Sequence, residues 1–337
     1  MGLTGEYWPY HPKPFEDEIF SSWLIRTAQG NSAKIQSFCH FVWPHRQIWT
    51  RDIDRITASD LLETMALKTG TDREGLERLF LQFYEGSLVV QMKPKAFNPW
   101  VRYVGVRHRI RTRHGQLYCP LCLEADNTPY FRKIWRTNLS PVCLEHAVVL
   151  RDCCEKCGSP VIPHRGEFLS CHECSYDLRD AKAWACDAEA LSLAQALSGR
   201  ISGHIPWGLN VPDIDNDLEF FATVRAVILL FCSGKRAPWI RQQTSNYVSF
   251  KVKIFAERQY DTQFECLRVN DLHQVFSLAA VLFRGWPWMF VGLCAEARMW
   301  KSWALKDLDT DEIPNFAKVV QSYLYEPYSS KTLLEND

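Results

Sequence analysis

Apolar residues near the N-terminus recur every three or four positions, which is the spacing of one helix face. Two helices are predicted there, one containing Ile19 and Trp23 and the next running from about Ser32 to Val42. Gly30 and the two polar residues after it separate them. A helix, a short glycine-containing turn and a second helix outline a helix-turn-helix. An all-helical core without any nucleic-acid role has the same outline.

Local signals refine this pattern. The acidic run 16–18 stands where the first helix is predicted to begin, and its charge suits the positive end of a helix dipole. A second pair of helices follows. The first of these covers 60–69, with Gly70 as its C-terminal cap. Thr71 and Glu74 have the spacing of a capping box for the next helix.

The half of the chain after Asp187 is again mainly helical in its apolar spacing. Helices are predicted over 188–197, 217–232, 272–283, 295–305 and 316–325. Pro287 forces a break after the third of these. This region is rich in tryptophan, which fits core packing. The sharper alternative is a partner-facing patch, because tryptophan is enriched in binding hot spots. The residues concerned are Trp286, Trp288, Trp300 and Trp303.

Composition then narrows the class of protein. The chain has 337 residues, of which 47% are hydrophobic and 23% charged, as in ordinary globular proteins of about two domains. The 39 basic residues equal the 39 acidic ones, which argues against a histone-like protein. No apolar run reaches the ~18 residues that cross a bilayer, and no secretory signal opens the chain. We expect a cytoplasmic protein, and clustered cysteines there more often bind metal than form disulfides.

Nine of the 13 cysteines lie between Cys119 and Cys186, and most are paired with two residues between partners. This spacing turns two side chains towards one tetrahedral ion. The pairs combine into two sets. The first set is Cys119, Cys122, Cys143 and His146, and the second is Cys154, Cys157, Cys171 and Cys174. Each set provides four ligands and leaves no open position, which is typical of a structural zinc site.

Alternatives remain at this point. Reduced core cysteines would need no metal, although chance rarely yields four such pairs within ~60 residues. Cys153 adjoins Cys154 and could replace it. Three histidines could compete as ligands: His114, His164 and His172.

A basic connector lies between Lys93 and Arg136, where ten Lys and Arg stand against two acids, a net charge of +8. Alternating arginines on a strand project from one face, where they could track phosphates while nearby aromatic residues stack on bases. The candidate nucleic-acid residues are Arg102, Arg107, Arg109, Arg111 and Arg113. The alternative is a solvated face, or arginines paired with acids elsewhere in the chain.

Motifs of common enzymes are missing. The sequence has no Gly-x-x-x-x-Gly-Lys-Ser/Thr, Gly-x-Gly-x-x-Gly, Gly-x-Ser-x-Gly or His-Glu-x-x-His. A zinc deaminase needs His-x-Glu ahead of Pro-Cys-x-x-Cys, whereas here Pro120 follows Cys119. We therefore expect no catalytic residues and no enzymatic activity.

Taken together, these patterns predict a mainly α-helical protein with small zinc-ribbon elements. Three domains are expected. They are an N-terminal helix-turn-helix-like region (1–92), a basic connector with two zinc-binding modules (93–180) and a C-terminal helical domain (181–337).

In this order of parts the chain resembles the TniQ/TnsD family of transposition target-selection proteins. The motifs that carry the resemblance are Pro14–Glu18, Ser21–Ala28, Cys119–His146 with its paired ligands, Cys154–Cys174 with its own, and more loosely Leu282–Pro287. One departure is Ser175, which stands after the last cysteine where glycine is common.

The resemblance implies a non-enzymatic adaptor in DNA transposition. Such proteins connect a target-recognising element to an AAA+ regulator that recruits the transposase. In CRISPR-associated transposons that element is an RNA-guided Cascade-type complex, and the adaptor is often a homodimer. DNA and guide RNA are then further partners. Longer TnsD-like members bind an attachment site directly, and this chain offers little room for an extensive DNA-reading region. The alternative is a zinc-containing helix-turn-helix protein that binds target DNA itself, as a TnsD-like protein or transcription regulator.

Overall fold

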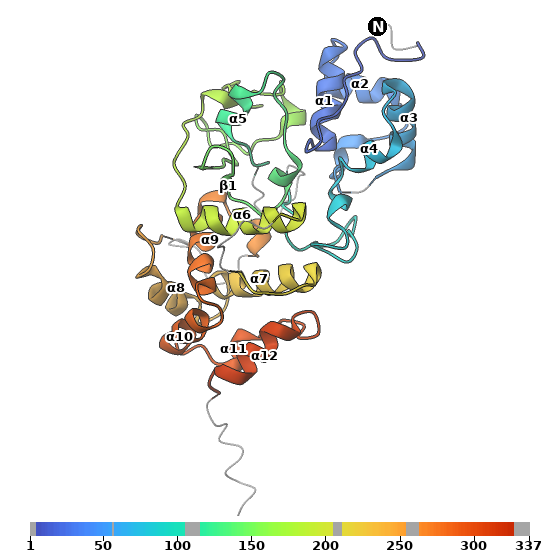
Figure 1. Cartoon of the computed structure of the whole chain (residues 1–337). Coiled ribbons are helices and arrows are strands. Elements are labelled where there is room, and N and C mark those ends of the chain that lie inside the picture. The colour runs from blue at the N-terminus through green and yellow to red at the C-terminus, as the bar shows by residue number, and fades with distance from the viewer. Residues whose placement is uncertain (1–4, 56, 105–114, 205–210, 254–262, 327–337) are drawn as a thin grey trace, which may run out of the picture. The chain divides into compact units, whose positions relative to one another are not determined.

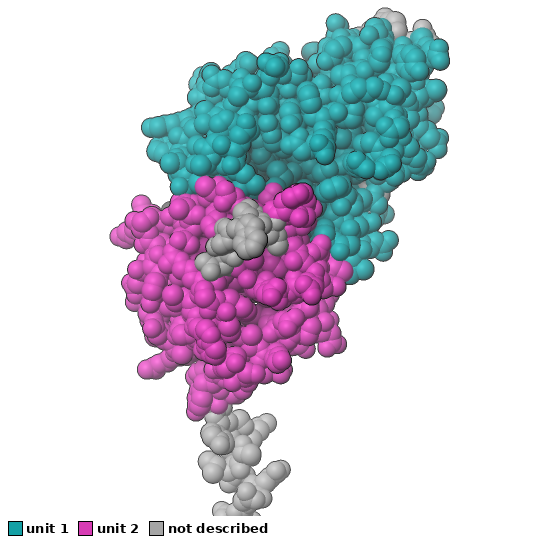
Figure 2. Space-filling model, viewed as in Figure 1, with its two compact units in different colours: residues 1–186, 265–269 teal, residues 187–264, 270–337 magenta. Residues whose placement is uncertain are grey.

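The computed structural model describes residues 5–55, 57–104, 115–204, 211–253 and 263–326. The chain divides into two compact units (Figure 2). Unit 1 comprises 1–186 with 265–269, and unit 2 comprises 187–264 with 270–337. The architecture is mainly helical with few strands, as the sequence predicts. The division into three domains stays a prediction.

Unit 1 begins with the two predicted helix pairs. Its helices are α1 (Phe20–Gly30), α2 (Ile35–Val42), α3 (Ser59–Thr69) and α4 (Arg73–Glu77) (Figure 1). α1 packs against α2, and α3 against α4. Trp23 and Leu24 of α1 are fully buried, in agreement with their predicted apolar face. Gly70 ends α3 in the left-handed conformation with φ of 59°, which glycine adopts without strain.

Two local predictions in this region are wrong. The acidic run precedes α1 instead of forming its first turn. Glu18 is buried and its carboxylate pairs with Arg26 at 2.6 Å, so an internal ion pair uses the charge. The cap of α4 is Asp72, whose carboxylate accepts a hydrogen bond from the Gly75 amide at 2.7 Å. Thr71 instead accepts a hydrogen bond from the Thr69 hydroxyl.

The remainder of unit 1 consists of short elements. These are α5 (Pro120–Ala125) and the strands β1 (Val142–Cys143) and β2 (Val148–Val149), which pair antiparallel. Short 3₁₀ helices occur along the chain at Ile48–Thr50, Leu81–Tyr84, Lys133–Arg136, Pro163–Arg165, Leu178–Asp180 and Phe264–Cys266. Elements this short contribute little periodic apolar surface, which is why the sequence did not predict α5.

Unit 2 is built from longer helices. They are α6 (Ala188–Ser202), α7 (Asp217–Cys232), α8 (Ala237–Ser245), most of α9 (Val269–Phe283), α10 (Trp288–Glu296), α11 (Lys301–Ala304) and α12 (Pro314–Tyr323). α7 packs against both α8 and α12, and α8 also packs against α10. The predicted helix 217–232 coincides with α7, whose Phe221, Val224 and Ile228 are fully buried.

The tryptophan-rich stretch departs from its prediction. The single helix predicted over 295–305 is wrong, because α10 ends at Glu296 and Arg298 takes a positive φ of 51° before α11 begins. Core packing is also wrong for Trp288, which is 62% exposed. The other three tryptophans of the stretch are half-buried.

The length and hydropathy of the helices indicate whether any of them could cross a membrane. Within the described ranges, no single helix combines the length and apolar character that a membrane crossing requires. α9 and α10 pass such a test only when joined, and they meet at a bend of 112°. Most residues of α9 are buried inside the protein.

Candidate metal centres

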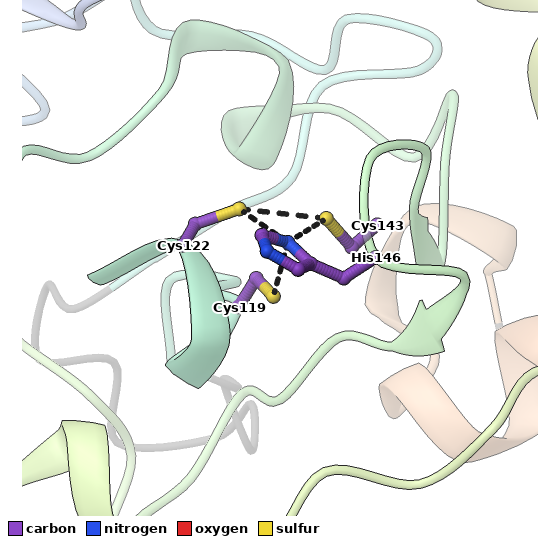
Figure 3. Close-up of side chains that lie close together, drawn as sticks. All are labelled: Cys119, Cys122, Cys143 and His146. Carbon is purple, nitrogen blue, oxygen red and sulfur yellow. Dashed lines mark hydrogen bonds between the residues drawn. The ribbon is translucent and has the colours of Figure 1, made fainter. Parts of the chain in front are cut away.

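The first predicted ligand set is assembled in the structure. Its four donor atoms lie within 4.8 Å of one another (Figure 3). Cys119 immediately precedes α5 and Cys122 lies within it, while Cys143 ends β1 and His146 lies in the turn between the strands. The Ala147 amide donates to the Cys143 carbonyl at 2.9 Å, which closes this turn around the histidine.

The distances in this cluster fit a tetrahedral zinc ion. With ordinary bond lengths, the edges of a zinc tetrahedron are about 3.8 Å between two sulfurs and about 3.5 Å between sulfur and nitrogen. The sulfurs of Cys122 and Cys143 are 3.5 Å apart. The Nδ1 atom of His146 lies 3.8, 3.3 and 3.5 Å from the sulfurs of Cys119, Cys122 and Cys143. The four donors are therefore spaced as ligands of one ion.

The second set is also assembled, with its four sulfurs within 4.8 Å. Cys154 and Cys174 are 3.6 Å apart, and Cys157 and Cys171 are 3.5 Å apart. These values again match sulfur–sulfur edges of a zinc tetrahedron. Hydrogen bonding by Ser159 lowers the pKa of the Cys157 thiol to about 6, and this favours the thiolate form that binds metal.

One backbone device recurs in three of the ligand turns. Four residues after Cys143, Cys154 and Cys171, an amide donates back to the cysteine carbonyl at 2.9 Å. The donors are Ala147, Gly158 and Ser175, with φ values of 50°, 73° and 56°. Only Gly158 takes this left-handed conformation without cost. Ser175, where glycine is common, thus keeps the geometry of the turn and bears its strain.

The structure resolves most of the ligand alternatives. Cys153 lies outside the second cluster and instead pairs through its backbone with Pro160. His164 stacks on Trp49 with ring centroids 4.4 Å apart. His172 lies 3.3 Å from the carboxylate of Glu173. His114 lies outside the described residues.

Both centres are closed sites. Each uses four protein donors, which leaves no position for a substrate or an activated water. The first is well covered, with three buried cysteines and a half-buried histidine. The two sets of residues are positioned to bind two zinc ions, and their chemistry is that of structural sites.

Arg102, the first of the candidate nucleic-acid residues, is 1% exposed. Its guanidinium pairs with Asp152 at 2.7 Å and donates to the carbonyls of Gly115 and Leu267 at 3.2 and 3.0 Å. The alternative interpretation is therefore correct for Arg102: it pairs with an acid elsewhere in the chain. Its side chain is too buried to contact a phosphate. Arg107, Arg109, Arg111 and Arg113 lie outside the described residues.

The same holds for other cations of the basic connector. Arg136 is buried and pairs with Asp52 at 2.6 Å and with Asp54. Burial raises the pKa of Asp54 to about 6, against the lowering effect of Arg136. Burial likewise lowers the pKa of Lys133 to about 8. The net charge of the connector therefore overstates its basic surface. The sequence does not predict these ion pairs. The acid that pairs with Arg102 lies 50 positions away, and one that pairs with Arg136 lies 84 positions away.

Part of the chain is similar to a known protein family. The family model named TniQ matches residues 9–150. That span includes α1 to α4, α5 and the whole first metal centre, while the second centre lies beyond it. A search of curated proteins found no match. Residues 9–150 are thus similar to a TniQ domain, and this similarity indicates a transposition-associated protein.

Proposed function

We propose that the chain is a non-enzymatic adaptor that selects the insertion site in DNA transposition. It links an RNA-guided, Cascade-type target-recognition complex to an AAA+ transposition regulator, and it works in the cytoplasm. The observation that carries the proposal is the TniQ match, which covers the N-terminal helices and the first metal centre together.

The metal centres suit such a role. An adaptor must hold several contact surfaces in fixed relation, and closed four-ligand sites provide rigidity without chemistry. The first centre ties α5 to the β1–β2 turn, and the second ties two turns to each other. Weak contacts with several partners then strengthen one another, because each bound partner raises the effective concentration of the next.

We also propose that unit 1 contacts nucleic acid, through four of the five candidate arginines. Arg102 is engaged in its internal ion pair. The remaining candidates are Arg107, Arg109, Arg111 and Arg113, which would contact the phosphate backbone. Changing these four to glutamine should flatten the salt dependence of DNA or RNA binding, by a slope of about 0.7 to 0.9 per lost phosphate contact. An unchanged slope excludes them.

The test is co-purification with separately produced candidates. The tagged chain is mixed with an RNA-guided complex and an AAA+ regulator from a transposon encoding a TniQ protein, with and without guide RNA. We expect a complex containing all components only when guide RNA is present. The Cys153→Ser variant, which leaves both ligand sets intact, should behave like the wild type, while Cys119→Ser should not assemble.

Direct binding of a DNA duplex by the chain alone would contradict the proposal. If the chain binds a specific duplex alone at roughly nanomolar affinity, and assembly does not depend on guide RNA, the adaptor proposal is wrong. The chain would then be a zinc-containing protein that reads target DNA directly.

A further inference from the structure

Three tryptophans of unit 2 surround one arginine. We name this group the tryptophan cage; its members are Arg236, Trp239, Trp300 and Trp303. The central carbon of the Arg236 guanidinium lies 4.4 Å from the ring centroid of Trp303, 5.2 Å from that of Trp239 and 5.5 Å from that of Trp300. All three distances are within the range of cation–π attraction. The rings of Trp300 and Trp303 lie 4.7 Å apart.

Arg236 differs from two other arginines of this unit, which pair with carboxylates. Arg200 pairs with Asp217 at 2.5 Å, and Arg284 pairs with Glu189. In the described part of the chain, Arg236 pairs with no carboxylate, and its guanidinium lies over three indole rings. A guanidinium stacked in this way keeps its in-plane N–H groups available, and these groups match the oxygens of a phosphate or carboxylate.

The cage is partly exposed to solvent, and basic residues adjoin it in the sequence. Trp239 is 48% exposed, and the other three members are half-buried. Lys235, Arg298 and Lys301 adjoin the cage in the chain. Two acids also lie close by in sequence or contact, namely Glu296 and Glu326, and the Glu326 carboxylate accepts a hydrogen bond from the Ser302 amide at 2.9 Å. Among these neighbours, three residues are basic and two are acidic.

We propose that the tryptophan cage binds unpaired nucleotides of a single-stranded nucleic acid. A nucleotide uses both features of the cage, because its base stacks on an exposed indole while its phosphate accepts from the Arg236 edge. An acidic peptide would use the charge and leave the indole faces unused. A duplex keeps its bases stacked on each other, so its phosphates alone could bind. The cation–π contacts hold the rings in place before binding, which lowers the entropy lost on binding.

The inference stands apart from the adaptor proposal, since it needs no protein partner. The experiment measures binding of fluorescently labelled twenty-nucleotide oligo-dT and oligo-U to the full, zinc-loaded chain by anisotropy at low salt. The four connector arginines from Arg107 to Arg113 are changed to glutamine throughout, so that unit 1 does not mask the signal. The variants are Trp239→Ala, Trp303→Ala and Arg236→Gln. The matched control is Trp288→Ala, which removes another exposed indole, one at the start of α10 that packs on Tyr323 instead.

We expect each tryptophan variant to weaken binding at least about fivefold, as loss of one stacked base implies. Arg236→Gln should also reduce the slope of log K against log salt by about 0.7, because one phosphate contact is lost. Trp288→Ala should bind like the parent. Circular dichroism identifies any variant that fails to fold; Trp239→Ala changes the most exposed ring of the cage and serves if Trp303→Ala does not fold.

Several outcomes would overturn the proposal. One is that the parent chain binds neither oligonucleotide, and another is that the cage variants bind as tightly as the control. Equal binding of a duplex through the same residues would remove the preference for unpaired bases. If a glutamate-rich peptide binds and loses affinity in the cage variants while the oligonucleotides do not, the cage is a protein-docking site.

Discussion

The metal-binding part of unit 1 and the helical unit 2 are stabilised in different ways. Between residues 118 and 175 the regular elements are one six-residue helix, two two-residue strands and short 3₁₀ turns, arranged around two sets of ligands. Unit 2 instead buries the faces of long helices, above all α7 and α9. We expect the first region to depend on bonds to metal in addition to its buried apolar side chains, and the second to depend on apolar contacts alone. Removal of metal should therefore destabilise the first region and not unit 2, and a core substitution in unit 2 should not release the metal.

Removal of zinc should have the largest effect. Binding of a structural zinc ion contributes on the order of 10–16 kcal/mol in apparent terms, because the site does not exist in the unfolded chain. We expect Cys119→Ser and Cys154→Ser, or a strong chelator, to unfold residues 118–175 while α7 and α9 stay protected. Hydrogen exchange read by mass spectrometry measures both regions in one sample.

Cys153→Ser is the control for this prediction, since it changes a half-buried cysteine outside the cluster. It should retain two zinc ions per chain. Unchanged protection of 118–175 in the chelated protein would contradict a structural role for the metal.

A core substitution in unit 2 should give the converse result. Phe221 of α7 is fully buried, and Phe221→Ala should lower the free energy of unfolding of unit 2 by about 3–5 kcal/mol through lost burial and a cavity. Zinc content, measured by mass spectrometry of the metal, should stay at the wild-type value. If zinc were lost as well, the two units would not be stabilised independently.

Breaking the Arg102–Asp152 ion pair tests the interior of unit 1. Arg102→Met leaves the Asp152 carboxylate buried without its partner, which should cost about 3–5 kcal/mol in urea unfolding of this unit. A pair that instead contacts nucleic acid would show a changed salt slope for binding and little change in stability. The double variant Arg102→Met with Asp152→Leu should recover much of the loss, because no buried charge remains.

His164 should make unit 1 sensitive to mild acid. Desolvation lowers the pKa of His164 to about 4 in the folded chain, against 6.5 for an ordinary histidine. Its contribution to stability is thus fully present above pH 6.5 and is lost as the pH falls towards 4, by at most about 3 kcal/mol. His164→Phe keeps the stack on Trp49 and removes the titration.

The measurement is the difference between wild type and His164→Phe in urea unfolding from pH 7 to 4. Loss of zinc in acid affects both proteins alike and cancels in this difference. A constant difference across the range would show that His164 does not titrate in this way.

The smallest effects concern the ligand turns. Ser175→Gly should stabilise the second metal centre by about 1 kcal/mol, because it relieves the left-handed strain of a non-glycine residue. Gly158→Ala should destabilise it by about 1–2 kcal/mol for the opposite reason. A Cβ atom at Gly158 would meet nothing within 4 Å, so the loss of stability would come from backbone strain and not from a steric clash. Thermal unfolding of the zinc-loaded protein measures both.

Local signals in the sequence determined much of this protein. The spacing of seven cysteines and one histidine identified all eight residues that the structure brings together in two clusters, because ligands of one knuckle are neighbours in the chain. Long periodic helices such as α7 were equally clear. The short α5 and the break between α10 and α11 were not, since so few residues carry no period.

Only the tertiary structure decided the fate of the charges and the tryptophans. The arginines at 102 and 136 and the lysine at 133 look like a basic surface in the sequence, yet they are buried against carboxylates or carbonyls that lie far away in the chain. Arg236 has Trp239 three positions away in the sequence, but only the fold brings Trp300 and Trp303 to it. Side-chain burial and ionic pairing depend on which distant segments meet, and a linear pattern does not contain that information.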